Sequence, residues 1–181
     1  MPHSLERAPT GRARCRGCGV PIGKGELRLG EAVANPYADT EGAETLHWYH
    51  PACSAFKRPD VFLQVVAESV APVENREALS AAAALGVSHH RVARVDRAER
   101  AASGRAACRA CKTPIEKGAW RLALVFYEDG RFSPSGYIHL GCAAAYLETT
   151  DIMDRLRHFT PGLTADDLEE IRRGLERPAS P

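Results

Sequence analysis

The sequence lacks any hydrophobic run long enough to cross a membrane, and it lacks a strong net charge. Of its 181 residues, 24 are basic and 23 are acidic, which leaves a formal charge of +1. A chain so close to neutrality is not a polycation that coats nucleic acid with its whole surface. A span of the bilayer needs about 20 consecutive apolar residues, and the first ten residues are too polar for a secretory signal. These absences predict a protein that is not secreted. The richness in Ala and Arg points to a bacterial source with GC-rich DNA. We expect the protein in the cytoplasm or associated with the nucleoid.

Motifs for catalysis are also missing. The sequence contains no nucleophile elbow, no phosphate-binding loop and no paired carboxylates at a catalytic spacing. We therefore expect a protein that is not an enzyme and that takes no small-molecule substrate.

No cysteine is spare. The six cysteines and two of the seven histidines form two copies of one pattern, Cys-x2-Cys followed by His-x2-Cys. Three thiolates and one imidazole are the ligands of a closed structural zinc site, and they leave no position for a catalytic water. Three disulfides would need an oxidising compartment, for which the sequence gives no signal. We therefore predict two zinc ions per chain. The predicted ligands are Cys15, Cys18, His50 and Cys53 in the first copy and Cys108, Cys111, His139 and Cys142 in the second.

An internal repeat divides the chain into two modules. Residues 10–29 align without gaps to residues 103–122, and 12 of these 20 positions are identical. Each half is too small for a large core, and a metal ion compensates for this. Residue patterns predict strands at 27–29, 45–49 and 120–127, and helices at 59–70, 73–85, 143–159 and 164–175. The expected fold is α+β, with two small zinc-stapled modules that each contain a short antiparallel sheet and packing helices.

The domain boundaries follow from the repeat and from changes in composition. We expect a flexible tail at 1–9, a first zinc-finger unit with a helical extension at 10–86, a helical linker at 87–102, a second such unit at 103–177, and a flexible tail at 178–181. The linker is predicted to be helical because it has good helix formers and no internal Gly or Pro. His89 and His90 within it lack a cysteine at metal-binding spacing, so we expect them on the surface.

Basic residues gather around both cysteine pairs. Five basic residues and one acidic residue lie between Thr10 and Arg28, and the same numbers recur between Ser103 and Arg121. A solvated charged face is the ordinary explanation for such residues. Their repetition around both metal sites favours localised contact with phosphates instead.

Each half resembles the zinc finger of the poly(ADP-ribose) polymerase type, which is also found at the front of a nick-sensing DNA ligase. In the first half the resemblance is carried by Gly11-Arg12-Ala13-x-Cys15, Ile22-x-Lys24-Gly25-x-Leu27-Arg28 and His47-Trp48-Tyr49-His50. The second half has Gly104-Arg105-Ala106-x-Cys108 and Ile115-x-Lys117-Gly118-x-x-Arg121-Leu122, but Gly136-Tyr137-Ile138-His139 replaces His-Trp-Tyr-His. The resemblance covers residues 10–86 and 103–177. Nothing in the sequence resembles the catalytic domain of the polymerase or of a ligase.

This resemblance implies a non-enzymatic protein that binds DNA strand breaks by shape and acts in DNA repair. The arginines that it implies as phosphate contacts, expected to be exposed, are Arg12, Arg28, Arg105 and Arg121. The side chains that it implies for stacking on the open base pair are Tyr37 and Leu46 in the first copy and Phe126, Phe132 and Tyr137 in the second. The expected partner is broken DNA, with a repair enzyme at the same break as a second partner. The alternative is a zinc-stapled protein-interaction adaptor whose basic surface is incidental.

Overall fold

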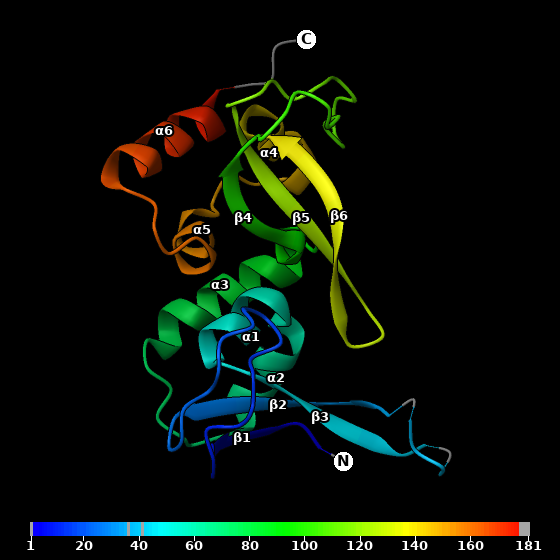
Figure 1. The fold of residues 1–181 in the computed structure, drawn as a ribbon. Helices are drawn as coiled ribbons and strands as arrows, with labels where there is room; N and C mark the ends of the chain where they lie inside the picture. Colours follow the sequence, from blue (N-terminus) through cyan, green and yellow to red (C-terminus); the bar gives the residue numbers. More distant parts are fainter. Residues whose placement is uncertain (1, 36, 41, 178–181) are drawn as a thin grey trace. The chain divides into compact units, whose positions relative to one another are not determined.

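The structure is a computed structural model that describes residues 2–35, 37–40 and 42–177. These residues form two compact units. The first contains the described residues up to Ser88 together with Asp129–Phe132, and the second contains His89–Glu128 and the described residues from Ser133 onward. Each unit is built on a three-stranded sheet with accompanying helices (Figure 1), which confirms the predicted mixed fold. The tail predicted at 178–181 lies outside the described residues.

The first unit begins with its sheet. Its strands are β1 (Ser4–Arg7), β2 (Leu27–Ala34) and β3 (Glu44–Tyr49), which pair antiparallel in the order β1-β2-β3. Three helices follow: α1 (Pro51–Lys57), α2 (Pro59–Glu68) and α3 (Arg76–Ser88). The first two each begin with a proline, whose fixed φ and missing N–H suit the first helical position. The strands and helices predicted for this unit are confirmed, with shifted ends.

The core of the first unit lies between the sheet and the helices. Leu29 of β2 and Phe62 of α2 are fully buried there. A strand alternates its side chains between two faces, so Leu27 and Glu31 share the face of Leu29 and Arg28 points to the other. The buried carboxylate of Glu31 accepts hydrogen bonds from Arg58 Nε and Nη2 at 2.8 and 2.6 Å, and this pairing compensates for the desolvation of the charge.

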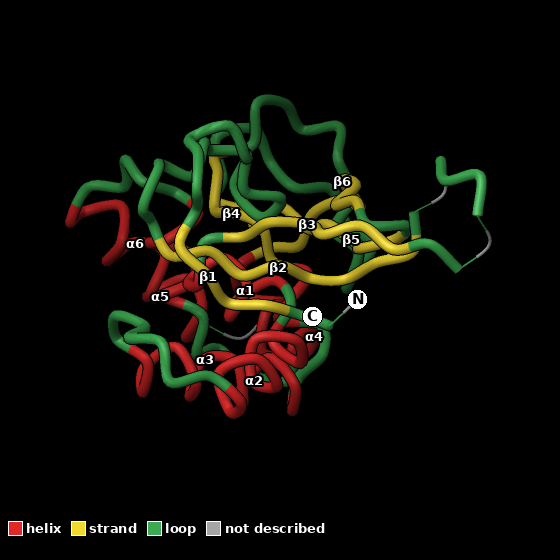
Figure 2. Tube along the Cα trace, turned by 90° about the horizontal axis from the view of Figure 1, so that it is seen from below, coloured by secondary structure: helices red, strands yellow, loops and turns green. Residues whose placement is uncertain are grey.

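The second unit repeats this plan with shorter helices. Its elements are the 3₁₀ turn η1 (Val92–Arg94), the strands β4 (Val95–Arg100), β5 (Trp120–Glu128) and β6 (Arg131–His139), the 3₁₀ turn η2 (Leu140–Cys142), and the helices α4 (Ala143–Leu147), α5 (Met153–Phe159) and α6 (Ala165–Glu176). The sheet order is β4-β5-β6. Leu122, Ile138, Leu156 and Ile171 are fully buried in its core. Figure 2 distinguishes the strands from the helices in both units.

Two predictions for irregular or helical segments are wrong. The tail predicted at 1–9 contains β1, and the helix predicted at 87–102 is η1 followed by β4. Both strands pair antiparallel with the strand that follows the cysteine pair, β1 with β2 and β4 with β5. Helix propensity is a weak preference of a few tenths of a kcal/mol per residue. Pairing with a neighbouring strand over its whole length outweighs that preference.

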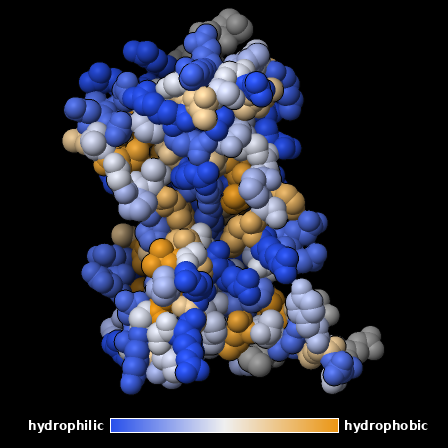
Figure 3. Space-filling model, viewed as in Figure 1, coloured by the Kyte–Doolittle hydropathy of each residue, from blue (hydrophilic) through white to orange (hydrophobic). Residues whose placement is uncertain are grey.

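The predicted helix at 143–159 is also interrupted. It divides into α4 and α5 because Glu148 adopts a left-handed conformation, with φ 63°, at the end of α4. In the described part of the chain, no helix has both the length and the apolar character to cross a membrane. Figure 3 shows one face of the molecule, on which hydrophilic residues predominate and hydrophobic residues are scattered among them.

Candidate metal centres and nucleic-acid interface

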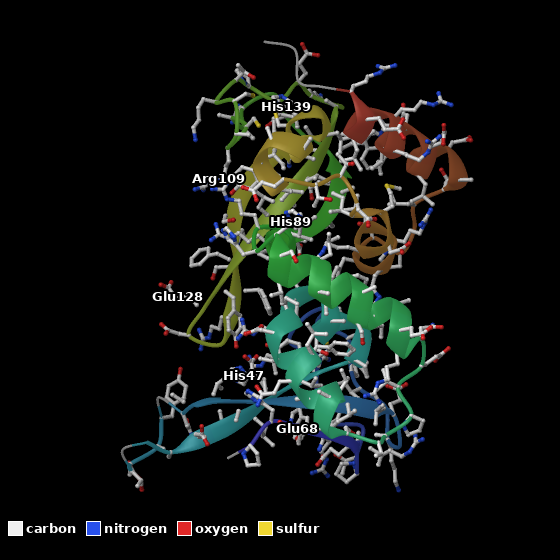
Figure 4. All side chains as sticks on the ribbon, turned by 180° about the vertical axis from the view of Figure 1, so that it is seen from behind. His47, Glu68, His89, Arg109, Glu128 and His139 are labelled. Carbon is white, nitrogen blue, oxygen red and sulfur yellow. The ribbon has the colours of Figure 1, made fainter. Side chains whose placement is uncertain are left out.

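The eight predicted ligands converge into two groups of four. In each group the three Sγ atoms and one histidine nitrogen all lie within 4.8 Å of one another. The Nδ1 atoms of His50 and His139 face the sulfurs, at 3.5 Å from Cys18 and 3.4 Å from Cys111 (His139 is labelled in Figure 4). Three soft sulfurs and one imidazole at this spacing fit a tetrahedral zinc ion.

The turn that holds each cysteine pair has the same backbone in both units. Cys15 N donates to Val20 O at 2.9 Å, and Cys108 N donates to Thr113 O at 2.8 Å. The turn requires a left-handed residue directly after the second cysteine. Gly19 meets this requirement with φ 75°, whereas Lys112 adopts φ 67° despite its side chain. Glycine takes this conformation without steric cost, and other residues do not.

Groups outside the ligand sets orient the ligands. The backbone N–H of His50 donates to Cys15 Sγ and that of His139 to Cys108 Sγ, both at 3.4 Å. His139 Nε2 lies 3.2 Å from Pro114 O. A proton on Nε2 makes this a hydrogen bond and leaves Nδ1 as the nitrogen that can bind a metal, the arrangement common around protein zinc sites.

In each group the pKa of one thiol is lowered and the pKa of another is raised. A hydrogen bond from Cys53 lowers the pKa of Cys15 to about 3, and the same bond, together with burial, raises the pKa of Cys53. In the second group, hydrogen bonds with Thr113 lower the pKa of Cys111 to about 6, while burial and the neighbouring thiols raise the pKa of Cys142 to about 12. Three thiolates at this separation repel one another, and a divalent cation offsets that repulsion. The donor sets therefore fit zinc, whose contribution here would be structural.

Two of the arginines predicted to be exposed are buried. Arg28 retains 7% and Arg121 retains 6% of its accessible surface. Arg28 donates from Nε and Nη2 to Glu6, and its guanidinium lies 3.5 Å from the ring centre of Trp48. Arg121 repeats this arrangement with Glu99 and a Tyr137 ring 3.4 Å away. The expectation of exposure is wrong because each carboxylate partner lies on a strand, β1 or β4, that the sequence did not predict.

Other arginines beside the metal centres are exposed. Arg12 and Arg105 have exposed side chains that form no hydrogen bond or ion pair with the described residues. Arg16 and Arg109 belong to the basic residues counted around the cysteine pairs, although they are not among the four predicted phosphate contacts. They lie between the two cysteines of each pair, and both are exposed. Their backbone N–H groups donate to Trp48 O and Tyr137 O at 2.8 Å, which ties the metal turn to β3 and β6. The signal for them in the sequence is that both aligned positions of the repeat hold an arginine. Arg109, labelled in Figure 4, also donates from Nη1 to Ser135 O.

The predicted stacking residues occupy different environments. Tyr37 has 81% of its surface exposed in the loop between β2 and β3, and Phe126 of β5 is 36% exposed. Leu46 on β3 and Phe132 on β6 are half-buried. Tyr137 has one ring face covered by Arg121. Of the five, Tyr37 presents the most surface to solvent.

Two Cys₃His centres, each joining a cysteine turn to the end of a sheet and the start of a helix, define a pair of structural zinc modules. Residues 6–86 match the family model of the Poly(ADP-ribose) polymerase and DNA-Ligase Zn-finger region. The first unit is thus similar to the zinc fingers of the poly(ADP-ribose) polymerase type, which confirms the resemblance inferred for the first half of the sequence. The second unit repeats its metal ligands and its sheet.

Relatives with known names support this assignment. Poly [ADP-ribose] polymerase 1 of Gallus gallus is 29% identical over 137 residues, which cover 67% of this chain and 13% of the relative. The Oryza sativa subsp. japonica protein of the same name is 29% identical over 151 residues, with 77% and 14% covered. The Xenopus laevis protein is 29% identical over 191 residues, with 93% and 18% covered. The chain therefore spans less than a fifth of the length of these relatives, and the similarity concerns the finger region.

Proposed function

We propose that this protein binds DNA strand breaks without base-sequence preference and without catalysis of its own, as part of DNA repair. The observation that carries the proposal is the zinc-finger match over residues 6–86. The duplicated Cys₃His centres with exposed arginines beside both of them support it. Phosphate contacts position a protein on DNA but carry no sequence information. A role in a bacterial nucleoid is part of this proposal.

The arginines divide into two kinds in this proposal. Arg12 and Arg105 are direct phosphate contacts, and Arg16 and Arg109 extend the same basic surface along the metal turns. Arg28 and Arg121 bind their carboxylate partners through Nε and Nη2. Each therefore offers a phosphate only the edge of its guanidinium at Nη1, and each also stabilises its unit.

A strand break differs from intact duplex because it exposes the face of a base pair. An aromatic or leucine side chain that stacks on that face contributes roughly 1–3 kcal/mol. We assign this role first to Tyr37, because of its exposure. Leu46, Phe126, Phe132 and Tyr137 remain the other proposed stacking residues.

The test compares nicked, gapped, blunt-ended and sealed duplexes of one sequence at two salt concentrations. We expect tighter binding to the broken duplexes, and weaker binding at the higher salt concentration because phosphate contacts release counterions. Equal affinity for nicked and sealed DNA would remove the break-binding proposal. Salt-independent or absent DNA binding would favour the protein-interaction adaptor instead. A repair enzyme remains the proposed protein partner at the break.

A further inference from the structure

A groove of about 630 Å³ opens on the first unit, on the helix-facing side of its sheet. Its walls come from the ends of β1 and β2, the start of α1, and the segment that leads into α3. Arg7 and Leu27 form the sheet side, and Pro72 and Leu79 contribute apolar surface opposite them. The groove is not part of the surface around Arg28, because Leu27 and Arg28 are consecutive and point to opposite faces of β2.

The internal repeat provides a reference for this groove. Arg7 at the end of β1 pairs with Leu27, and Arg100 at the end of β4 pairs with Trp120. Both arginines make the same local contact. Arg7 Nη1 donates to Gly25 O at 2.9 Å, and Arg100 Nη1 donates to Gly118 O at 3.2 Å. The two arginines are therefore equivalent positions of one architecture.

In the second unit, side chains of that unit itself occupy the equivalent place. The Arg100 guanidinium lies 4.5 Å from the ring centre of Trp120 and binds the carboxylate of Glu170 on α6. Trp120 Nε1 donates to the same carboxylate at 2.7 Å. Hydrogen bonds from Trp120 and Arg100 lower the pKa of Glu170, so the carboxylate is held in its charged form. Arg100 thus contacts one indole ring and one carboxylate, both from its own unit.

The first unit lacks both of these groups. Leu27 stands where the second unit has Trp120. Helices α3 and α6 begin at the same distance from the last metal-binding cysteine, and Ala81 stands at the position on α3 that matches Glu170 on α6. Arg7 is exposed and forms no ion pair with the residues that the structure describes. Among the described residues, Arg7 thus keeps the backbone contact of Arg100 but has no counterpart of its indole and carboxylate partners.

We propose that this groove binds a segment of a partner protein that presents an aromatic side chain beside a single carboxylate. The aromatic ring occupies the space that Trp120 fills in the second unit and stacks on Arg7, and the carboxylate replaces Glu170. The other charged groups in the groove limit the acidity of the partner. Glu26 and Glu74 line it as well, and Glu26 accepts a hydrogen bond from Gly23 N at 2.7 Å. These two acids repel a polyacidic segment, so one carboxylate is preferred over a run of them.

The test uses a ten-residue peptide with Trp and a neighbouring Glu at its centre and neutral polar residues elsewhere. Binding to the full-length, zinc-loaded protein is measured by calorimetry and by NMR shift changes at Leu27 and Leu79. Replacing the peptide Trp by Ala or its Glu by Gln should weaken binding about tenfold, in line with a desolvated cation–π contact and a charged hydrogen bond. A peptide with Glu at every flanking position should bind less well than the peptide with one Glu.

The decisive variant introduces the missing groups of the second unit into the first, as Leu27→Trp with Ala81→Glu. It should fill the groove, abolish peptide binding and raise the melting temperature. Arg7→Gln is the milder variant and should weaken peptide binding about tenfold with little change in stability.

Nicked-DNA affinity, measured on the same samples, should remain unchanged in the double variant, so that failure of this proposal and failure of the DNA proposal are separable. No peptide binding by the wild type, or binding that the double variant retains, would overturn the proposal. So would a concentration-dependent dimer that the double variant loses, since this would assign the groove to a second copy.

Discussion

Arg28 is a buried arginine whose contacts in the structure lie within its own unit. Its guanidinium is bonded on one edge to Glu6 and lies over Trp48 on one face, so its removal leaves a half-exposed carboxylate without its partner and uncovers the indole. We expect Arg28→Ala to lower the free energy of unfolding by roughly 1–3 kcal/mol. Thermal or denaturant unfolding of the zinc-loaded protein measures this loss.

Arg12→Ala is the matched control for that substitution. Arg12 is exposed and lies in the same unit, so its replacement should change stability by less than about 0.5 kcal/mol. It should weaken binding to nicked DNA and reduce the salt slope by about one. Unchanged DNA affinity in Arg12→Ala, with zinc content preserved, would remove Arg12 from the interface. A fully stable Arg28→Ala would show that the Glu6 pairing contributes nothing to the fold.

Gly19 provides a second prediction at this scale, because it carries a left-handed φ of 75° with no atom close to the position of an added Cβ. Gly19→Ala should therefore destabilise the first unit through backbone strain alone, by about 1 kcal/mol. Gly11→Ala is the control, since an added Cβ at Gly11 meets its nearest neighbour at an ordinary 3.6 Å and its φ is not left-handed. Equal melting temperatures for the two variants would contradict the prediction.

The helices and strands that were predicted correctly are those that local sequence patterns encode. The metal ligands, β2, β3, β5 and most helices were predictable because cysteine spacing and apolar periodicity are local patterns. β1 and β4 were missed because their pairing partners lie about 20 residues away, and neither strand has a strong alternation of its own. The burial of Arg28 and Arg121 was missed for the same reason, since Glu6 and Glu99 belong to those two strands. The groove beside Arg7 was not predictable either, because Arg7 lies on β1, a strand that the sequence did not predict. Its comparison with the second unit depends in addition on the contacts that α6 makes there.

The start of α6 gives the prediction for this scale. Thr164 accepts a hydrogen bond from Asp167 N at 3.1 Å, and Asp167 accepts one from Thr164 N at 3.0 Å, which forms a capping box. Thr164→Ala should destabilise the protein by about 1 kcal/mol. Thr150→Ala is the control, because Thr150 is exposed and its side chain has no hydrogen bond to a described residue. Chemical denaturation at neutral pH compares the two, and equal midpoints would contradict a role for the cap.

The same cap predicts a dependence on pH. Hydrogen bonds from the backbone and side chain of Thr164 lower the pKa of Asp167. A carboxyl whose pKa is depressed by folding contributes stability above its unfolded pKa of about 4, and loses that contribution as the pH falls through the folded value. The difference in stability between the wild type and Thr164→Ala should therefore be largest near neutral pH and should narrow below about pH 4. A gap that stays constant down to pH 2 would show that the carboxylate takes no part in it.

For the whole molecule, the two metal centres predict two zinc ions per chain. Structural zinc sites in finger peptides bind with apparent free energies on the order of 10–16 kcal/mol, so a chelator should unfold both units. Metal analysis should give two equivalents for the wild type and one each for Cys53→Ser and Cys142→Ser. Circular dichroism of the chelated protein follows the unfolding. A single equivalent in the wild type, or native dichroism without metal, would contradict the prediction.

The position of β1 and β4 ahead of their cysteine pairs has a practical consequence for dissecting the protein. The similarity between the two halves begins at residues 10 and 103, and a fragment cut at either point would seem complete by alignment. Such a fragment would lack an edge strand, and with it Glu6 or Glu99. A buried arginine would then lose its counter-ion, and β2 or β5 would expose an unpaired edge that favours aggregation. Fragments meant to isolate one finger should therefore begin before Ser4 or before Val92, and an insoluble shorter fragment would report a missing strand rather than a finger unable to fold alone.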